Sequence, residues 1–269
     1  MIVRTLLLTS LLAALACEEE APAEPQAPAE PVEEAPPEPE PELPEADPNE
    51  ACARVVVVAY EGAAHAADSI TRTQEEARER AEALLARVDQ GESIANVARE
   101  ASDASSSGPR GGLLGTYERD EWPAAHDVLK EPVFALALGA RTPVLEAPYG
   151  YAFAERCAVQ KVHTRHILVR YAGARNAPDD VERTREAARE LATTLRASAT
   201  AEGADFAALA RERSEDSSAE RGGDLGAVGR GRLMPAYEAA AFALQPGAIS
   251  DVVETPFGFH VIQRMPDES

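Results

Sequence analysis

Apolar and polar positions along residues 51–269 run through the same succession twice. The run RVVVVAY at 54–60 predicts a buried strand, and RHILVRY at 165–171 predicts the same strand one repeat later. Each run is followed by a charged amphipathic helix, a shorter helix, a Gly-rich turn, another helix and a final strand. A long helix that separates the strands of one sheet is typical of an α+β fold.

The repeat is also visible in the letters of the sequence. GESIANVAREAS from Gly91 matches GADFAALARERS from Gly203, and the turn RGGLLG matches RGGDLG. FALALGARTPVLEAPYGYAF from Phe134 then aligns without a gap with FALQPGAISDVVETPFGFHV from Phe242. The sequence therefore predicts two tandem domains that meet near residue 160.

Residues 1–17, MIVRTLLLTSLLAALAC, predict a signal peptide, because the apolar run is about half as long as a bilayer span requires. Small residues before Cys17 resemble the bacterial lipoprotein signal, in which this cysteine is lipidated, although that family usually has Leu in place of Ala14. Glu18 stands where Asp often causes retention in the inner membrane. We therefore expect an outer-membrane lipoprotein that faces the periplasm. The alternative is cleavage after Ala16, which leaves a soluble secreted protein.

Residues 18–50 predict a disordered tether. They contain thirteen Asp or Glu, ten Pro and no Lys or Arg. Proline keeps such a segment extended at about 3.1 Å per residue, so it reaches on the order of 100 Å. The tether accounts for most of the net charge of −21, and with Arg4 counted, residues 51–269 carry the remaining −9. A charge of this sign argues against nucleic acid as a partner.

The second repeat, residues 161–269, resembles the parvulin family of peptidyl-prolyl isomerases. The resemblance rests on three ordered blocks, HTRHILVRY, SEDSSAERGGDLGAVGRGRLMPAYEAAAF and ISDVVETPFGFHVI. It implies a four-stranded antiparallel sheet flanked by helices, with the first and last strands adjacent at the centre. The first repeat, residues 51–160, is expected to be a degenerate copy of this domain.

Isomerisation of an X-Pro bond breaks no covalent bond, yet it crosses a barrier of roughly 18 to 20 kcal/mol because rotation disrupts amide resonance. A catalyst therefore needs an apolar socket for the proline ring and polar groups that favour the twisted amide. The resemblance assigns the polar roles to four residues: His166, Asp216, Thr255 and His260. It assigns the substrate-binding socket to six more: Leu225, Val228, Leu233, Met234, Tyr237 and Phe257.

Simpler interpretations of these residues remain open at this stage. A single histidine on a strand is usually a packed core residue, and Asp216 is also placed to cap a helix or turn. Residues three apart on a strand point to opposite faces, so His163 and His166 do not share a metal ion. No metal site and no cofactor are predicted.

The first repeat lacks the polar groups of the second. Val55 occupies the position of His166, Ala152 occupies the position of His260, and Leu113 replaces an aspartate beside the Gly pair. A domain that retains the fold without these groups is expected to be a non-catalytic binding or scaffolding module.

Two further features belong to the first repeat. Trp122 and Tyr117 lie in a longer loop and are expected to contact clients, unless Trp122 only fixes that loop. Cys52 and Cys157 flank the repeat and fall nearly opposite each other if its first and last strands pair. Because export leads to an oxidising compartment, we expect a disulfide between them.

Together these features predict an exported isomerase that acts on X-Pro bonds of unfolded or folding envelope proteins, held to the membrane by an N-terminal lipid anchor. The alternative is a periplasmic chaperone without significant isomerase activity. Both hypotheses require polypeptide clients.

Overall fold

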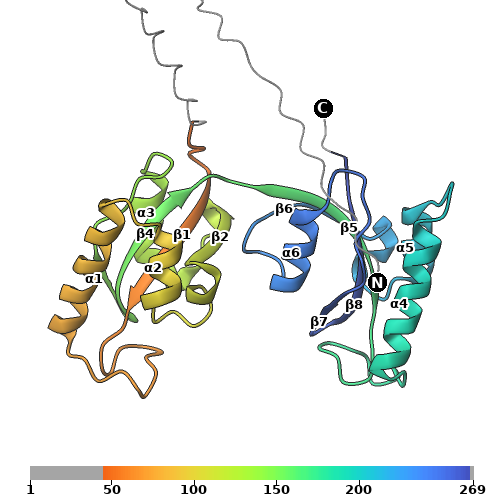
Figure 1. The fold of residues 1–269 in the computed structure, drawn as a ribbon, viewed down its shortest axis with the longest axis horizontal. Helices are drawn as coiled ribbons and strands as arrows, with labels where there is room; N and C mark the ends of the chain where they lie inside the picture. The colour runs from red at the N-terminus through yellow and green to blue at the C-terminus, as the bar shows by residue number, and fades with distance from the viewer. Residues whose placement is uncertain (1–44, 267–269) are drawn as a thin grey trace, which may run out of the picture. The chain divides into compact units, whose positions relative to one another are not determined.

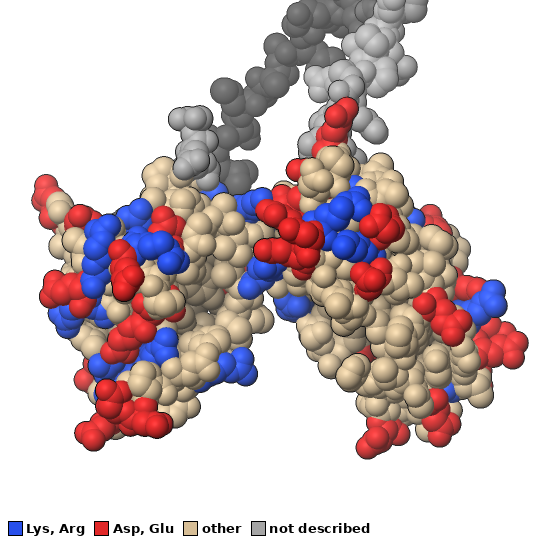
Figure 2. Space-filling model, turned by 180° about the vertical axis from the view of Figure 1, so that it is seen from behind, with Lys and Arg blue, Asp and Glu red and all other residues tan. Residues whose placement is uncertain are grey.

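The computed structural model describes residues 45–266 of the 269-residue chain, so the expected signal peptide, Cys17 and most of the expected tether lie outside the described residues. Within residues 45–266, no helix is long and apolar enough to span a bilayer. Acidic and basic side chains are interspersed on the face shown in Figure 2.

The first repeat forms a four-stranded antiparallel sheet with the order β2-β1-β4-β3. Its strands are β1 (Glu50–Val58), β2 (Leu113–Glu118), β3 (Leu145–Ala147) and β4 (Gly150–Cys157). Its α-helices are α1 (Gln74–Asp89), α2 (Ile94–Ala101) and α3 (Asp127–Phe134). Short 3-10 helices span Gly108–Arg110, Arg119–Glu121 and Ala124–His126.

The second repeat forms the same sheet, with the order β6-β5-β8-β7 (Figure 1). Its strands are β5 (Lys161–Val169), β6 (Asp224–Gly229), β7 (Val253–Thr255) and β8 (Gly258–Arg264). Its helices are α4 (Arg185–Ala199), α5 (Phe206–Arg213), α6 (Pro235–Ala243) and the 3-10 helix Ser217–Arg221. The prediction of an α+β fold with the first and last strands at the centre of each sheet is confirmed.

Threonines fix the start of the long helix in each repeat. The hydroxyl of Thr73 accepts the N–H of Glu76 at 3.2 Å, and the Glu76 carboxylate accepts the N–H of Thr73 at 2.7 Å. In the second repeat the hydroxyl of Thr184 accepts the N–H of Ala187 at 3.2 Å. Both helices pack against the same face of their sheets.

Each sheet carries a core on both faces, because successive side chains of a strand point in opposite directions. In the second repeat, Ile167 and Phe259 are buried under α4 and α5. Val162, Ile262 and Tyr237 form a separate cluster under α6 on the opposite face. The even-numbered residues of β5 therefore face α6.

Gly223 contacts the backbone of His166 in β5. The N–H of His166 donates to the carbonyl of Gly223 at 2.9 Å. Gly223 has a φ of 79°, and a Cβ there would stand 2.1 Å from the carbonyl oxygen of His166, so only glycine fits. The first domain has the same contact, since the N–H of Val55 donates to the carbonyl of Gly112 at 2.8 Å. Val55 thus stands where His166 stands in the second repeat.

An ion pair that the sequence analysis missed recurs in both repeats. Asp103 pairs with Arg72 at 2.5 Å and accepts the N–H of Ala59 at 2.9 Å. Arg183 pairs with Glu215 at the corresponding place in the second repeat. Each ion pair joins the segment before the long helix (α1 or α4) to the segment after the short helix (α2 or α5). Asp103 therefore has a structural role.

The boundary predicted for the disordered tether, residues 18–50, is wrong at its end. Glu50 begins β1 and pairs with Glu118 of β2. The buried guanidinium of Arg156 donates to the carbonyl of Glu50 at 3.0 Å and also to that of Asp47. Arg156 therefore anchors the end of this acidic segment to the first domain.

The structure joins Cys52 of β1 to Cys157 of β4 through a disulfide, with Cα atoms 4.9 Å apart. The two cysteines are direct partners in the antiparallel register. The bond closes a sequence separation of 105 residues, so it links the two ends of the first repeat.

Removal of this disulfide is expected to destabilise the chain. The Cys52→Ala, Cys157→Ala double variant should lose about 2–4 kcal/mol of unfolding free energy, because a long loop is no longer closed in the unfolded state. Urea unfolding of oxidised wild type, reduced wild type and the variant measures the difference. Equal midpoints for all three would contradict the expectation.

Candidate functional site

A pocket of about 340 Å³ opens on the α6 face of the second sheet. Nine of the ten site residues expected from the sequence line it. They are His166, Asp216, Leu225, Leu233, Met234, Tyr237, Thr255, Phe257 and His260. The strand pairing explains the assembly, since β5 and β8 are adjacent and residues 94 positions apart come into contact.

Four polar side chains form a continuous row along one wall of this pocket. The Thr255 hydroxyl lies 2.8 Å from Nε2 of His260, and Nδ1 of His260 lies 3.2 Å from Nδ1 of His166. Nε2 of His166 then lies 3.2 Å from Oδ1 of Asp216. This last contact is an ion-pair approach rather than an aligned hydrogen bond. The row connects a strand end, the two central strands and the turn before β6.

His260 is held neutral by its surroundings. Only 5% of the residue is exposed, and burial lowers its pKa to about 3, with the nearby charge of His166 adding to the effect. A neutral imidazole has one N–H, so His260 donates from one ring nitrogen and accepts at the other. Its contacts with Thr255 and His166 satisfy both.

Asp216 is held ionised at the opposite end of the row. The contact with His166 lowers the pKa of its carboxyl well below the usual range, and hydrogen bonds from Ser218 add to this against the effect of burial. The N–H of Ser218 donates to Oδ1 of Asp216 at 2.9 Å. Asp216 thus caps the 3-10 helix and also presents a negative charge to the pocket, where a quarter of its side chain is exposed.

Tyr237 joins the polar row to the apolar part of the pocket. Its ring lies edge-on to both histidines, with centroids 5.7 Å from His166 and 5.4 Å from His260. Its hydroxyl lies 3.2 Å from that of Thr164, and burial raises its pKa well above the usual range. The phenol therefore remains neutral.

Val228 does not line this pocket, contrary to the prediction. It pairs with Val162, four residues along β5 from His166, which is roughly 13 Å at 3.3 Å per residue. Val228 instead lines a different cavity beside Lys161. The alignment placed it by sequence position, whereas the path of β6 decides the distance.

The pocket also has lining residues that the sequence analysis missed. They are Leu168, Arg170, Asn176 and Ser217. The period of two along β5 points to Leu168, which lies two positions from His166, and Arg170 follows directly after the end of this strand. Asn176 has a positive φ of 59°, and only the folded loop brings it to the pocket.

The corresponding region of the first repeat is filled rather than open. Trp122 is 6% exposed, packs edge-on against Tyr117 and Phe134, and donates its indole N–H to the carbonyl of His126 at 2.9 Å. The alternative interpretation therefore holds, in which Trp122 fixes the longer loop. Tyr117 is only partly buried and packs against the same core.

This geometry is suited to binding and twisting a peptide bond. The pocket offers an apolar socket beside one ionised carboxylate and a neutral histidine.

The chain shows clear similarity to known proteins. The PPIC-type PPIase domain model matches residues 43–155 and again 152–266. Chaperone SurA of Methylobacillus flagellatus is 35% identical over 197 residues, which cover 68% of this chain and 41% of that protein. Chaperone SurA of Nitrosospira multiformis is 34% identical over 224 residues, covering 78% and 46%. The chain belongs to the PPIC-type peptidyl-prolyl isomerase family, as the sequence analysis predicted.

A solved structure is also similar. The peptidyl-prolyl isomerase ESS1 from Candida albicans is 32% identical over 39% of this chain and 62% of its own, with a TM-score of 0.38. The aligned part of the chain spans less than half the length of the two SurA relatives.

The low pKa of His260 predicts a specific pH dependence of stability. The unfolded chain binds a proton at this histidine below about pH 6.5, whereas the folded chain does so only near pH 3. The free energy of unfolding should therefore fall as the pH decreases through this window. His260→Gln should show a shallower fall.

Urea unfolding at about pH 7, 6 and 5 tests this expectation, since ordinary carboxyl groups titrate mostly below that range. His65→Asn is the matched control, because His65 is exposed and its positive φ is one that asparagine tolerates. Equal slopes for wild type and His260→Gln would contradict the prediction.

Proposed function

We propose that the second domain, residues 161–269, catalyses cis-trans isomerisation of X-Pro bonds in unfolded or folding polypeptides. The observation that carries this proposal is the row from Thr255 through His260 and His166 to Asp216, set beside an apolar pocket. Membership of the isomerase family supports it.

In the proposed mechanism the proline ring enters the apolar part of the pocket, formed by Leu225, Leu233, Met234, Tyr237 and Phe257. Amide resonance places partial negative charge on the carbonyl oxygen, and twisting the bond removes it. A fixed carboxylate near that oxygen destabilises the planar form more than the twisted form. Asp216 supplies this charge, while the Thr255 and His260 contacts keep the row in place.

For the first domain, residues 51–160, we propose a non-catalytic role in holding clients. Its sheet has Val55 and Ala152 where the second domain has histidines, and Trp122 occupies the loop region. A second candidate function follows from the names of the relatives, which are chaperones. In that case both domains hold polypeptides without accelerating isomerisation.

Exchange of an X-Pro peptide followed by NMR tests the catalytic role. Asp216→Ala and His166→Ala should each lower the catalysed rate at least tenfold, which corresponds to about 1.4 kcal/mol of transition-state stabilisation. His163→Gln is the matched control, because His163 lies on the same strand and pairs with Asp224 away from the pocket. It should retain the wild-type rate.

The same variants separate the two candidate functions. If folded wild type does not accelerate exchange but suppresses client aggregation, and both variants do so equally well, the chaperone function replaces the isomerase. If the variants lose the acceleration of X-Pro exchange but still suppress client aggregation, the two activities use different surfaces.

We further propose that the chain is exported and anchored to the outer membrane through lipidated Cys17, facing the periplasm. The motif around Cys17 supports this. Cys17→Ala should move the protein from the membrane fraction to the soluble fraction and remove the incorporation of labelled palmitate. A wild-type protein that takes up no palmitate would instead support cleavage after Ala16.

A further inference from the structure

Three arginines of the first domain gather around one glycine turn. A Cβ on Gly111 would lie 3.1 Å from Nη2 of Arg99 and 3.2 Å from Nη1 of Arg54, so these two guanidinium groups flank the same point. Arg110 precedes Gly111 directly, and its side chain faces the same cavity as Arg54. This set is called the arginine cluster below.

The second domain contains the same three arginines together with a carboxylate. The counterparts of Arg54, Arg99 and Arg110 are Arg165, Arg211 and Arg221.

In the strand register Arg165 lies opposite Asp224. Burial opposes ionisation of that carboxyl, but the N–H of Gly226, the contact with His163 and, to a smaller extent, the charge of Arg165 lower its pKa. Arg54 lies opposite Leu113 at the same register position. The first domain therefore keeps the positive charges and lacks a carboxylate at the β2 position, although Glu155 lies opposite Arg54 on β4, where the second domain has Gln263 opposite Arg165.

Within residues 45–266, no carboxylate forms an ion pair with a member of the arginine cluster. Arg54 donates to the carbonyl of Gly111 at 2.7 Å, and Arg110 donates to the carbonyl of Ser106 at 3.0 Å. Arg99 donates to Ala95 and Asn96. All of these acceptors are neutral and leave further guanidinium donors available.

On the β4 side, Arg54 lies opposite Glu155. Glu155 attracts Arg54 but already pairs with Arg141 at 3.1 Å. Burial lowers the pKa of Arg54, and the positive charges of Arg99 and Arg230 lower it further. The cluster is thus under mutual repulsion that a bound anion would relieve.

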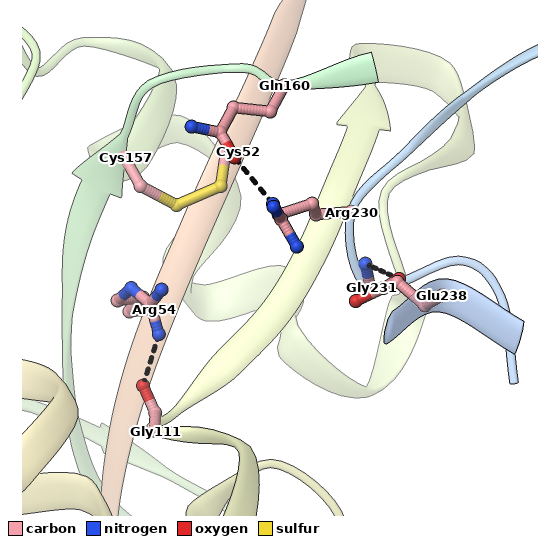
Figure 3. Close-up of a disulfide and its surroundings, with 8 residues drawn as sticks. All are labelled: Cys52, Arg54, Gly111, Cys157, Gln160, Arg230, Gly231 and Glu238. Carbon is pink, nitrogen blue, oxygen red and sulfur yellow. Dashed lines mark hydrogen bonds between the residues drawn. A yellow bond between two sulfur atoms is a disulfide. The ribbon is translucent and has the colours of Figure 1, made fainter. Parts of the chain in front are cut away.

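A cavity of about 540 Å³ leads to this cluster. Arg230 brings a further positive charge to it and donates to the side chain of Gln160 at 2.5 Å, beside the disulfide (Figure 3). Among the lining residues the single carboxylate is that of Glu238, which accepts the N–H of Gly231 at 2.6 Å. Leu113 and Pro235 supply apolar surface.

We propose that this cavity binds an extended polypeptide segment through its Asp or Glu side chains, with the ligand carboxylate taking the place that Asp224 fills in the second domain. Paired arginines recognise carboxylates with directed, charge-assisted hydrogen bonds. A mixture of apolar surface and guanidinium donors suits a peptide that carries both acidic and apolar side chains. Helix α6 lines both this cavity and the isomerase pocket.

Fluorescence anisotropy with the full chain tests the proposal. The probe is a labelled peptide of alternating Glu and apolar residues without proline, and its control has Gln in place of Glu. The Glu peptide should bind, more weakly as salt rises, and the Gln peptide should bind at least tenfold more weakly. Leu113→Asp should lower the affinity at least tenfold because it supplies the missing carboxylate, whereas Leu113→Asn should retain it.

A second pair of variants guards against misfolding of the first. Arg110→Gln with Arg230→Gln should also lower the affinity at least tenfold. Arg80→Gln with Arg213→Gln makes the same change of charge at exposed positions and should leave binding unchanged. None of these variants alters the isomerase pocket, so X-Pro exchange should proceed at the wild-type rate. Peptide binding by this cavity and isomerisation by the second domain are therefore tested independently.

Several outcomes would overturn the proposal. These are equal binding of the Glu and Gln peptides, equal affinities for Leu113→Asp and Leu113→Asn, and an equal loss in the exposed-arginine control. Tighter binding of a single-stranded DNA oligonucleotide through the same arginines would assign the cavity to nucleic acid. Binding by residues 43–269 but not by the full chain would assign it to the acidic residues of the chain itself.

Discussion

The antiparallel pairing of the first and last strands of each repeat is the constraint on which the rest of the structure depends. In the second domain it places His166 and His260 in contact although 94 residues separate them. In the first domain it brings Cys52 opposite Cys157 across a separation of 105 residues. The same strand pairing thus assembles a polar site in the second domain and positions a disulfide in the first.

The two domains show how one backbone supports different chemistry. Both use a glycine pair to hold the first strand, and both tie a loop with the same type of ion pair. The side chains on the shared sheet then differ. The polar row of the second domain is replaced by valine and alanine in the first, where Trp122 completes an apolar core.

The differences in side chains between the two domains change the charges that each domain presents. In the second domain burial keeps His260 neutral, and the contact with His166 keeps Asp216 ionised, so the pocket presents a defined carboxylate. In the first domain the replacement of an aspartate by Leu113 removes the carboxylate that lies opposite the first-strand arginine on the β2 side. A change of one residue type therefore alters what each domain is able to bind.

The sequence by itself determined the architecture and most of the pocket. The repeated apolar pattern and the three motif blocks predicted two sheets with central first and last strands, and they predicted nine of the residues that line the pocket. These features are local or depend on the strand period of two, which a sequence displays directly. Tertiary structure alone decided the position of Val228, the burial of Trp122 and the presence of Asn176 in the pocket. Their places depend on the path of an edge strand and on loop conformation, because distances across a fold arise from packing rather than from sequence spacing.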